Sequence, residues 1–108
     1  MGVDATLYRI HKNGTSARRW RLERLGDAMD VGDVVATLPE THPGRVTSRI
    51  KPYGSLVLYP TEMAEFVEDL ERIKTSLAQN NHAVIDAFIA LARRCAAEPE
   101  SELRLDGE

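Results

Sequence analysis

The segment from Arg18 to Arg24 holds the residue types best suited to bind an anionic ligand. Its arginines, Arg18, Arg19, Arg21 and Arg24, surround Trp20. Guanidinium groups bind phosphate oxygens, and an indole ring stacks on a nucleobase. The alternative is structural: alternation along a strand would bury Trp20 and Leu22 and expose Arg19, Arg21 and Glu23, where charge discourages aggregation. We favour the structural interpretation and keep nucleic-acid binding as the alternative.

A second charged group lies along a predicted helix that begins near Thr61. Its acidic residues are Glu62, Glu65, Glu68, Asp69 and Glu71. Such a cluster is usually a solvated helix face. Its functional interpretation is a docking surface for a basic partner protein, such as a toxin or effector, because opposite charge steers association. Of all the single features, this one gives the strongest functional hypothesis.

The sequence predicts no catalytic residue, no cofactor and no metal site. No nucleophile has a base placed beside it by a local motif, and there is no glycine-rich phosphate loop. Asp27, Asp30 and Asp33 are spaced by three, which does not match the ligand spacing of an EF-hand. His42 with Glu40 is the only acid/base pair that the sequence suggests, and two residues in a predicted loop are weak evidence for an enzyme.

Length and charge limit the classes of protein further. The 108 residues are enough for a single domain, 1–108. Residues 1–60 carry a net charge of +3 and residues 61–108 one of −6, which argues against a nucleic-acid binder that uses its whole surface. Cys95 is the only cysteine, and the longest apolar run, Ala87–Ala92, is too short to span a bilayer. We therefore expect a cytoplasmic protein without a membrane partner, with Cys95 as a small core residue.

The first 60 residues are predicted to form mainly short β-strands. We expect a strand over Val3–Ile10, a turn at Asn13-Gly14 and a return strand over Arg19–Leu25, because Asn-Gly is a strong hairpin signal. The alternative prediction for residues 17–25 is a short helix that is capped by Ser16 and ends at Gly26. The further expected elements are a turn-rich stretch at Gly26–Gly44 with β-like Val34-Val35-Ala36, a strand at Arg45–Ile50, a turn at Pro52-Tyr53-Gly54 and a strand at Ser55–Tyr59.

Two amphipathic helices follow between about Thr61 and Ala97. Thr61 is the expected N-cap of the first, whose apolar stripe is Met63, Phe66, Val67, Leu70, Ile73 and Leu77. Asn80-Asn81 should separate it from a second helix that is apolar on nearly all sides. Met63, Leu70, Leu77, Val84 and Leu91 are also spaced by seven. A single long helix that dimerises as a coiled coil is therefore the alternative, and it leaves monomer and homodimer both open.

These elements predict an α+β fold. We expect a small, mostly antiparallel sheet of about four or five strands, packed against an antiparallel two-helix hairpin. Leu103-Arg104-Leu105 supplies a short final strand at the C-terminus.

The stretch Arg49-Ile50-Lys51-Pro52-Tyr53-Gly54-Ser55-Leu56-Val57-Leu58, with the two helices and the final Leu-Arg-Leu-Asp-Gly-Glu segment, resembles a set of small uncharacterised bacterial proteins. Their turn usually reads Arg-Ile/Val-Asp-Pro-Tyr-Gly-Asp, so Lys51 and Ser55 replace two acidic residues here. The resemblance covers residues 45–107. It implies the α+β layout and an immunity- or antitoxin-like partner role, and it implies no activity.

Three hypotheses of function follow. The first is a non-enzymatic interaction domain, an immunity- or antitoxin-type inhibitor that uses its acidic helix face. The second is a nucleic-acid-binding module that uses residues 18–24. The third is an enzyme or small-ligand domain, for which a deep polar pocket around His42, Arg49 and Tyr53 would be the discriminating feature.

Overall fold

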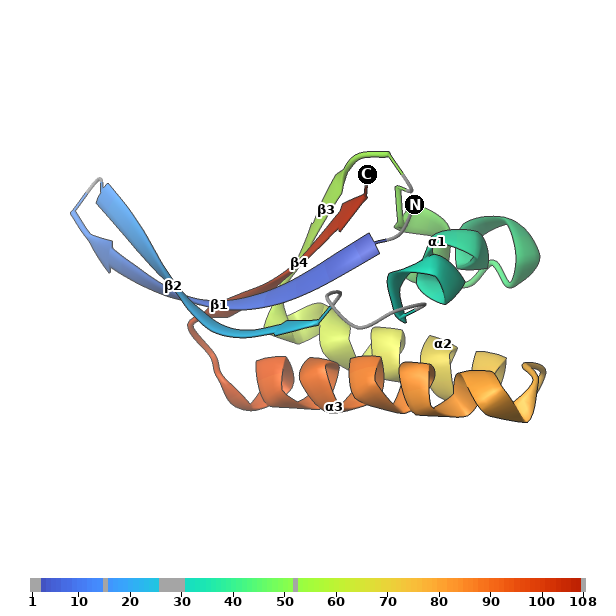
Figure 1. Ribbon diagram of the computed structural model, residues 1–108. Helices are drawn as coiled ribbons and strands as arrows, with labels where there is room; N and C mark the ends of the chain where they lie inside the picture. Colours follow the sequence, from blue (N-terminus) through green and yellow to red (C-terminus); the bar gives the residue numbers. More distant parts are fainter. Residues whose placement is uncertain (1–2, 15, 26–30, 52, 108) are drawn as a thin grey trace.

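The computed structural model describes residues 3–14, 16–25, 31–51 and 53–107, and these residues form an α+β fold (Figure 1). The strands are β1 (Val3–Asn13), β2 (Ser16–Leu25), β3 (Ser55–Leu58) and β4 (Ser101–Gly107). The α-helices are α1 (Val31–Thr41), α2 (Met63–Lys74) and α3 (His82–Ala97). Short 3-10 helices lie at Thr47–Arg49, Pro60–Glu62 and Gln79–Asn81. The predicted fold class is confirmed, with α1 as a helix beyond the expected two.

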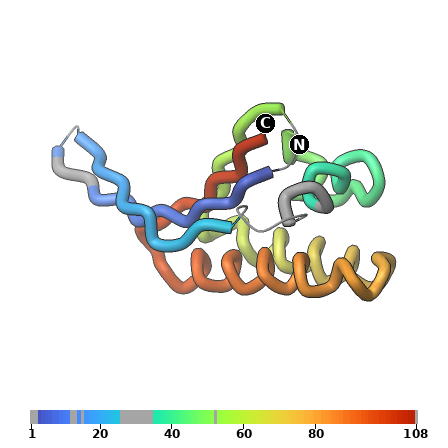
Figure 2. Tube along the Cα trace, viewed as in Figure 1, coloured from blue at the N-terminus to red at the C-terminus, as the bar shows by residue number. Residues whose placement is uncertain are grey.

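The sheet is antiparallel and has the order β2-β1-β4-β3. The final strand is confirmed, and it is a central one: β4 pairs with β1 from Ser101 to Gly107 and with β3 from Leu103 to Asp106. The chain ends therefore lie side by side, as Figure 2 shows. Because β1 comes first and β4 last among the four strands, the sheet forms only when these two strands pair with each other.

The helices cover one face of this sheet (Figure 1). β1 turns Val3, Ala5 and Leu7 toward them, and these side chains are fully buried. From α2, the buried residues are Met63, Phe66, Leu70 and Ile73; from α3, they are Ile85, Phe88, Ile89, Leu91, Ala92 and Cys95. The predicted stripe of α2 is thus confirmed at its centre, with Val67 and Leu77 half-buried at its margin.

The structure separates α2 from α3, so the single-helix alternative is wrong. The α-helix ends at Lys74, and Gln79–Asn81 forms a 3-10 turn before α3 begins at His82. The His82 ring nitrogen Nε2 lies 3.1 Å from the Leu77 carbonyl oxygen across this turn. The apolar composition of α3 does not mean that it is buried all round, because Ala83, Asp86 and Ala90 form an exposed side.

The expected turn-rich stretch at Gly26–Gly44 contains α1, so the β-like assignment of Val34-Val35-Ala36 is wrong. Val35 and Leu38, spaced as helical neighbours, are both fully buried, and this burial outweighs the β-preference of adjacent valines. Pro39 lies in the last turn of α1, where the loss of one amide donor is tolerated better than in a helix centre. Residues 26–30 lie outside the described part of the chain.

The predicted strand at Arg45–Ile50 is also wrong, since Thr47–Arg49 is a 3-10 helix. The backbone N–H groups of Val46 and Thr47 donate to the Asp69 carboxylate instead of to a neighbouring strand. Two smaller expectations change as well. Thr61 lies inside the Pro60–Glu62 turn and makes no capping bond. Asn13 is the last residue of β1 and pairs with Ser16, so it belongs to the strand and not to the expected Asn13-Gly14 turn.

Three other expectations near the strands hold. Residues 16–25 form a strand and not a helix. The Gly54 N–H donates to the Lys51 carbonyl oxygen at 3.2 Å, which closes the expected turn, although Pro52 lies outside the described residues. Cys95 is a buried core residue, and burial raises the pKa of its thiol. Among the described residues, no helix is both long and apolar enough to cross a membrane.

Phe88 of α3 is, with Phe66, one of the two largest fully buried side chains of the described core. We expect Phe88→Ala to lower the free energy of unfolding by about 3–5 kcal/mol, because it removes a fully buried aromatic ring and leaves a cavity. Ala90→Ser, on the exposed side of the same helix, should stay within about 0.5 kcal/mol of the parent. Urea denaturation of both variants measures the difference, and an equal loss in both would contradict the packing described.

Candidate functional site

The β1–β2 hairpin extends beyond the sheet as a two-stranded arm. β1 leaves β4 after Arg9, which pairs with Ser101, whereas β1 and β2 stay paired up to Asn13 and Ser16. Beyond Arg9, the Ile10 N–H still donates to the Glu100 carbonyl oxygen, just before β4, at 2.7 Å. Figure 1 shows the hairpin pointing away from the helices, and we use the word arm for its described residues between Arg9 and Arg21; Trp20 and Arg21 lie at its base, where their partners Arg9 and Tyr8 still pair with β4.

The arm presents two arginines without an acidic partner. Arg18 and Arg21 are exposed, and neither makes an ion pair within the described part of the chain. Arg19 differs, because its Nε lies 2.5 Å from Oε1 of Glu102, a carboxylate that is only 2% exposed. Arg24 pairs with Asp4 at 3.0 Å at the base of the hairpin. Of the four predicted arginines, Arg18 and Arg21 are thus the two available to an external anion.

Trp20 is 48% exposed on the arm, so the prediction that it lies in the core is wrong. It pairs with Arg9, the last residue of β1 that still meets β4, and α3 has already ended at Ala97. No helix therefore covers it. The His11 ring packs against Trp20 instead, with ring centroids 5.9 Å apart and the planes tilted by 57°.

A β-bulge explains why the expected alternation fails along β2. Leu7 pairs with Glu23 and Tyr8 with Arg21, so Leu22 has no partner opposite it. The extra residue places Glu23 on the same face as Trp20 rather than with Arg19 and Arg21. Glu23 then meets Arg94 of α3 at 3.1 Å. The bulge thus fixes the base of the arm to the helical layer.

The acidic residues of α2 are mostly neutralised by nearby arginines. Glu62 meets Arg49 at 2.7 Å, Glu65 meets Arg45 at 3.6 Å, and Glu71 meets Arg93 at 2.7 Å. Glu68 is exposed and has no ion pair among the described residues. The helix face that the sequence predicts as a docking surface therefore carries less free negative charge than its composition suggests.

Asp69 belongs to the fold rather than to this surface. It is 5% exposed, and its Oδ2 accepts hydrogen bonds from the backbone of Val46 at 2.7 Å and of Thr47 at 3.1 Å. A Cβ at Gly44 would lie 2.7 Å from Asp69 Cγ, so the close approach of this loop requires glycine. Helical spacing from Phe66 and Ile73 could have placed Asp69 at the edge of the buried stripe.

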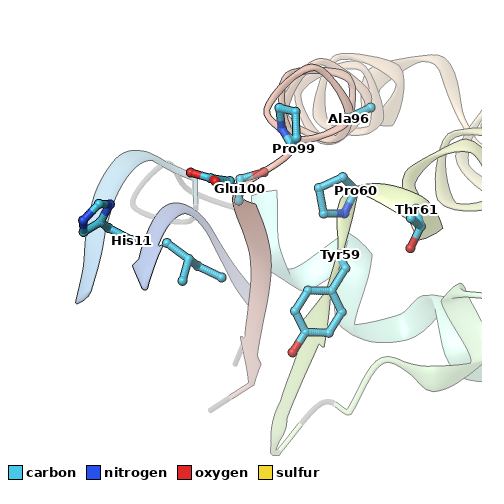
Figure 3. Close-up of a pocket in the computed structure, with 9 residues that line it drawn as sticks. His11, Tyr59, Pro60, Thr61, Ala96, Pro99 and Glu100 are labelled. Carbon is cyan, nitrogen blue, oxygen red and sulfur yellow. The ribbon is translucent and has the colours of Figure 1, made fainter. Parts of the chain in front are cut away.

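A groove lies where the arm leaves the sheet, beside the start of β4. Its volume is about 800 Å³, and its lining residues are Ile10, His11, Tyr59, Pro60, Thr61, Ala96, Pro99, Glu100 and Ser101. Figure 3 shows His11 and Tyr59 on opposite sides of the groove. β3 stops at Leu58, so the first residues of β4 pair with β1 and have no strand partner on the β3 side. The sequence could not reveal this groove, because three distant segments form it.

The residues proposed for an enzyme pocket are held apart by separate partners. The His42 Nδ1 lies 2.9 Å from the Thr41 hydroxyl oxygen, Arg49 pairs with Glu62, and Tyr53 is 74% exposed. Within the described residues there is no cluster of His, Cys, Asp and Glu that could hold a metal ion. Asp27 and Asp30 lie outside the described residues, as does the side chain of Asp33.

No family model, curated protein or solved structure matches this chain. Its function therefore has to be inferred from the geometry of its own residues.

The structural role assigned to Asp69 can be separated from a surface role by mutation. We expect Asp69→Ala to destabilise the fold by about 2 kcal/mol or more, because two buried N–H groups lose their acceptor. Glu68→Ala, the exposed neighbour, should change the free energy of unfolding by less than about 0.5 kcal/mol. Thermal and urea unfolding measure both variants, and an Asp69 variant as stable as the Glu68 variant would refute the assignment.

Proposed function

We propose that the protein is a non-enzymatic binding domain whose arm binds nucleic acid. The observation that carries this proposal is the pair of unpaired, exposed guanidinium groups near the exposed Trp20: Arg18 lies on the same face of β2 as Trp20, and Arg21 lies on the other face of this edge strand. Phosphate oxygens accept hydrogen bonds from guanidinium groups, and the charge of a nucleic-acid backbone supplies the counter-ion that the arm lacks.

The distribution of the other charges supports the same surface. Arg45 and Arg93 on the helical side each contact a carboxylate of α2, and Arg49 contacts Glu62 in the 3-10 turn before it. An arginine with a carboxylate partner would have to give up that contact to bind phosphate, whereas Arg18 and Arg21 would not. The arm is thus the described part of the surface where basic side chains bind an anion at least cost.

The charge of the rest of the chain would also limit the contact. Residues 61–108 carry a net charge of −6 and supply α2, α3 and the central strand β4, so a polyanion is repelled from the body of the molecule. Contact would be limited to the projecting arm, which is narrow because it consists of two strands. A two-stranded ribbon can enter the major groove of a duplex or lie along a single strand.

A partner protein bound at the α2 face is the second candidate, an immunity- or antitoxin-type inhibitor of a basic protein. The resemblance of residues 45–107 to small bacterial proteins and the exposure of Glu65 and Glu68 support it. A fair test leaves Asp69 unchanged, because Asp69 holds the Val46–Thr47 backbone. If this candidate is right, Glu65→Lys with Glu68→Lys should abolish binding of the protein that co-purifies from the native host. Retained binding in a pull-down would exclude it.

The nucleic-acid proposal predicts a specific loss on changing the arm. We expect Arg18→Gln with Arg21→Gln to weaken oligonucleotide binding by about tenfold or more at low salt, because two phosphate contacts are lost. The slope of log affinity against log salt should fall by about one to two. Fluorescence anisotropy of a labelled oligonucleotide over a range of salt concentrations measures both quantities.

The matched control removes the same charge elsewhere. Arg45→Gln with Arg93→Gln changes two exposed arginines on the helical side, at little cost in stability since surface ion pairs contribute little. Compared with the arm variant at 0.1 M salt, it should leave affinity within about twofold of the parent, because long-range charge effects are screened over about 10 Å at that salt concentration. Equal losses in both double variants, or no binding by the parent at low salt, would refute the proposal.

A further inference from the structure

The aromatic surface of the arm continues into the groove at its base. Trp20 packs against His11, and His11 is also one of the residues that line the groove. Across the groove lies Tyr59, whose side chain is 48% exposed (Figure 3). Trp20, His11 and Tyr59 therefore mark a path of exposed rings that runs from the arm onto the body of the protein.

The groove itself offers surfaces for a flat, weakly polar group. Pro60, Ala96 and Pro99 contribute apolar atoms, and Tyr59 contributes a ring on which a base can stack. Glu100 is the acidic residue of the lining. A carboxylate repels phosphate but accepts hydrogen bonds from the exocyclic amino group of a base. The groove therefore suits a nucleobase, and the arginines outside it suit the backbone.

We propose that the arm and the groove together form a site for single-stranded nucleic acid. Arg18, on the same face of β2 as Trp20, and Arg21, on the other face of this edge strand, hold phosphates as the nucleic-acid backbone passes around the free edge of β2. One base stacks on Trp20, and another enters the groove beside Tyr59. This inference rests on the proposed nucleic-acid function and specifies the form of nucleic acid that the site accepts.

The geometry disfavours a duplex at this site. Paired bases in a duplex are stacked on one another and expose only their edges in the grooves. The faces of Trp20 and Tyr59 can be covered only by bases that have left such a stack. Stacking on an aromatic side chain contributes about 1–3 kcal/mol per base, which corresponds to about fivefold or more in affinity.

Trp20 is the only tryptophan, so its fluorescence reports directly on the arm. The probes are a single-stranded DNA of mixed sequence about 12 nucleotides long, the RNA of the same sequence, and the corresponding DNA duplex. The full-length protein is titrated with each probe at low salt. We expect both single strands to quench Trp20 and to bind about fivefold or more tightly than the duplex; the ratio of the DNA and RNA affinities shows which sugar the site prefers.

The aromatic path is tested by a matched pair of tyrosine variants. Tyr59→Ala should weaken single-strand binding by about fivefold and leave duplex binding unchanged, since it removes one stacking surface. Tyr53→Ala removes the most exposed aromatic residue of the described chain, which lies outside the groove, and should change neither affinity. Circular dichroism and thermal unfolding verify that both variants are folded.

The outcomes separate this inference from the function on which it rests. Duplex binding equal to or tighter than single-strand binding, still sensitive to Arg18 and Arg21, would overturn the single-strand site and leave the arm as a nucleic-acid contact. Equal effects of Tyr59→Ala and Tyr53→Ala would overturn the role of the groove. Failure of all three probes to bind would overturn both proposals.

Discussion

The unequal lengths of two paired strands determine the shape of this molecule. β1 continues to Asn13, but its neighbour β4 begins only at Ser101, opposite Arg9. β4 cannot begin earlier in the sequence, because α3 runs to Ala97 and the chain turns at Pro99 before it reaches the sheet. Beyond Arg9, β1 can therefore pair only with β2, and the two strands leave the sheet as an arm.

Both features of the candidate site follow from this mismatch. Trp20 is exposed because it lies on the edge strand β2 opposite Arg9, where no helix extends to cover it. The groove forms at the same place, because β3 ends at Leu58 and the first residues of β4 have only one strand neighbour. The arginines of the helical side meet acids of α2, whereas Arg18 and Arg21 on the edge strand β2 make no ion pair with a described carboxylate.

Local periodicity predicted the elements that are stabilised by a regular buried stripe. Three features could be predicted because their burial follows the period of the element: the α2 stripe from Met63 to Ile73, the break near Asn80 and the strand at Leu103. α1 could not be predicted from sequence, because its adjacent valines locally favour a strand. Only the burial of Val35 and Leu38 against the rest of the fold makes the helix the preferred conformation. The 3-10 segment at Thr47 depends on Asp69, which is distant in sequence and could not be paired with it from local pattern.

The candidate site was predictable only in part, for a similar reason. Composition identifies the arginines and the tryptophan, but alternation alone placed Trp20 in the core. Its exposure depends on its pairing with Arg9 and on the end of α3 at Ala97, and neither is visible in the segment itself.

The central claim is that the arm, not the α2 face, contacts the partner. It is tested most directly by backbone amide NMR of the full-length protein titrated with the single-stranded oligonucleotide. The account predicts shift changes along residues 9–13 and 16–21 and near Tyr59, with the amides around Glu65 and Glu68 unchanged. Changes concentrated around Glu65 and Glu68, with the arm unaffected, would contradict it.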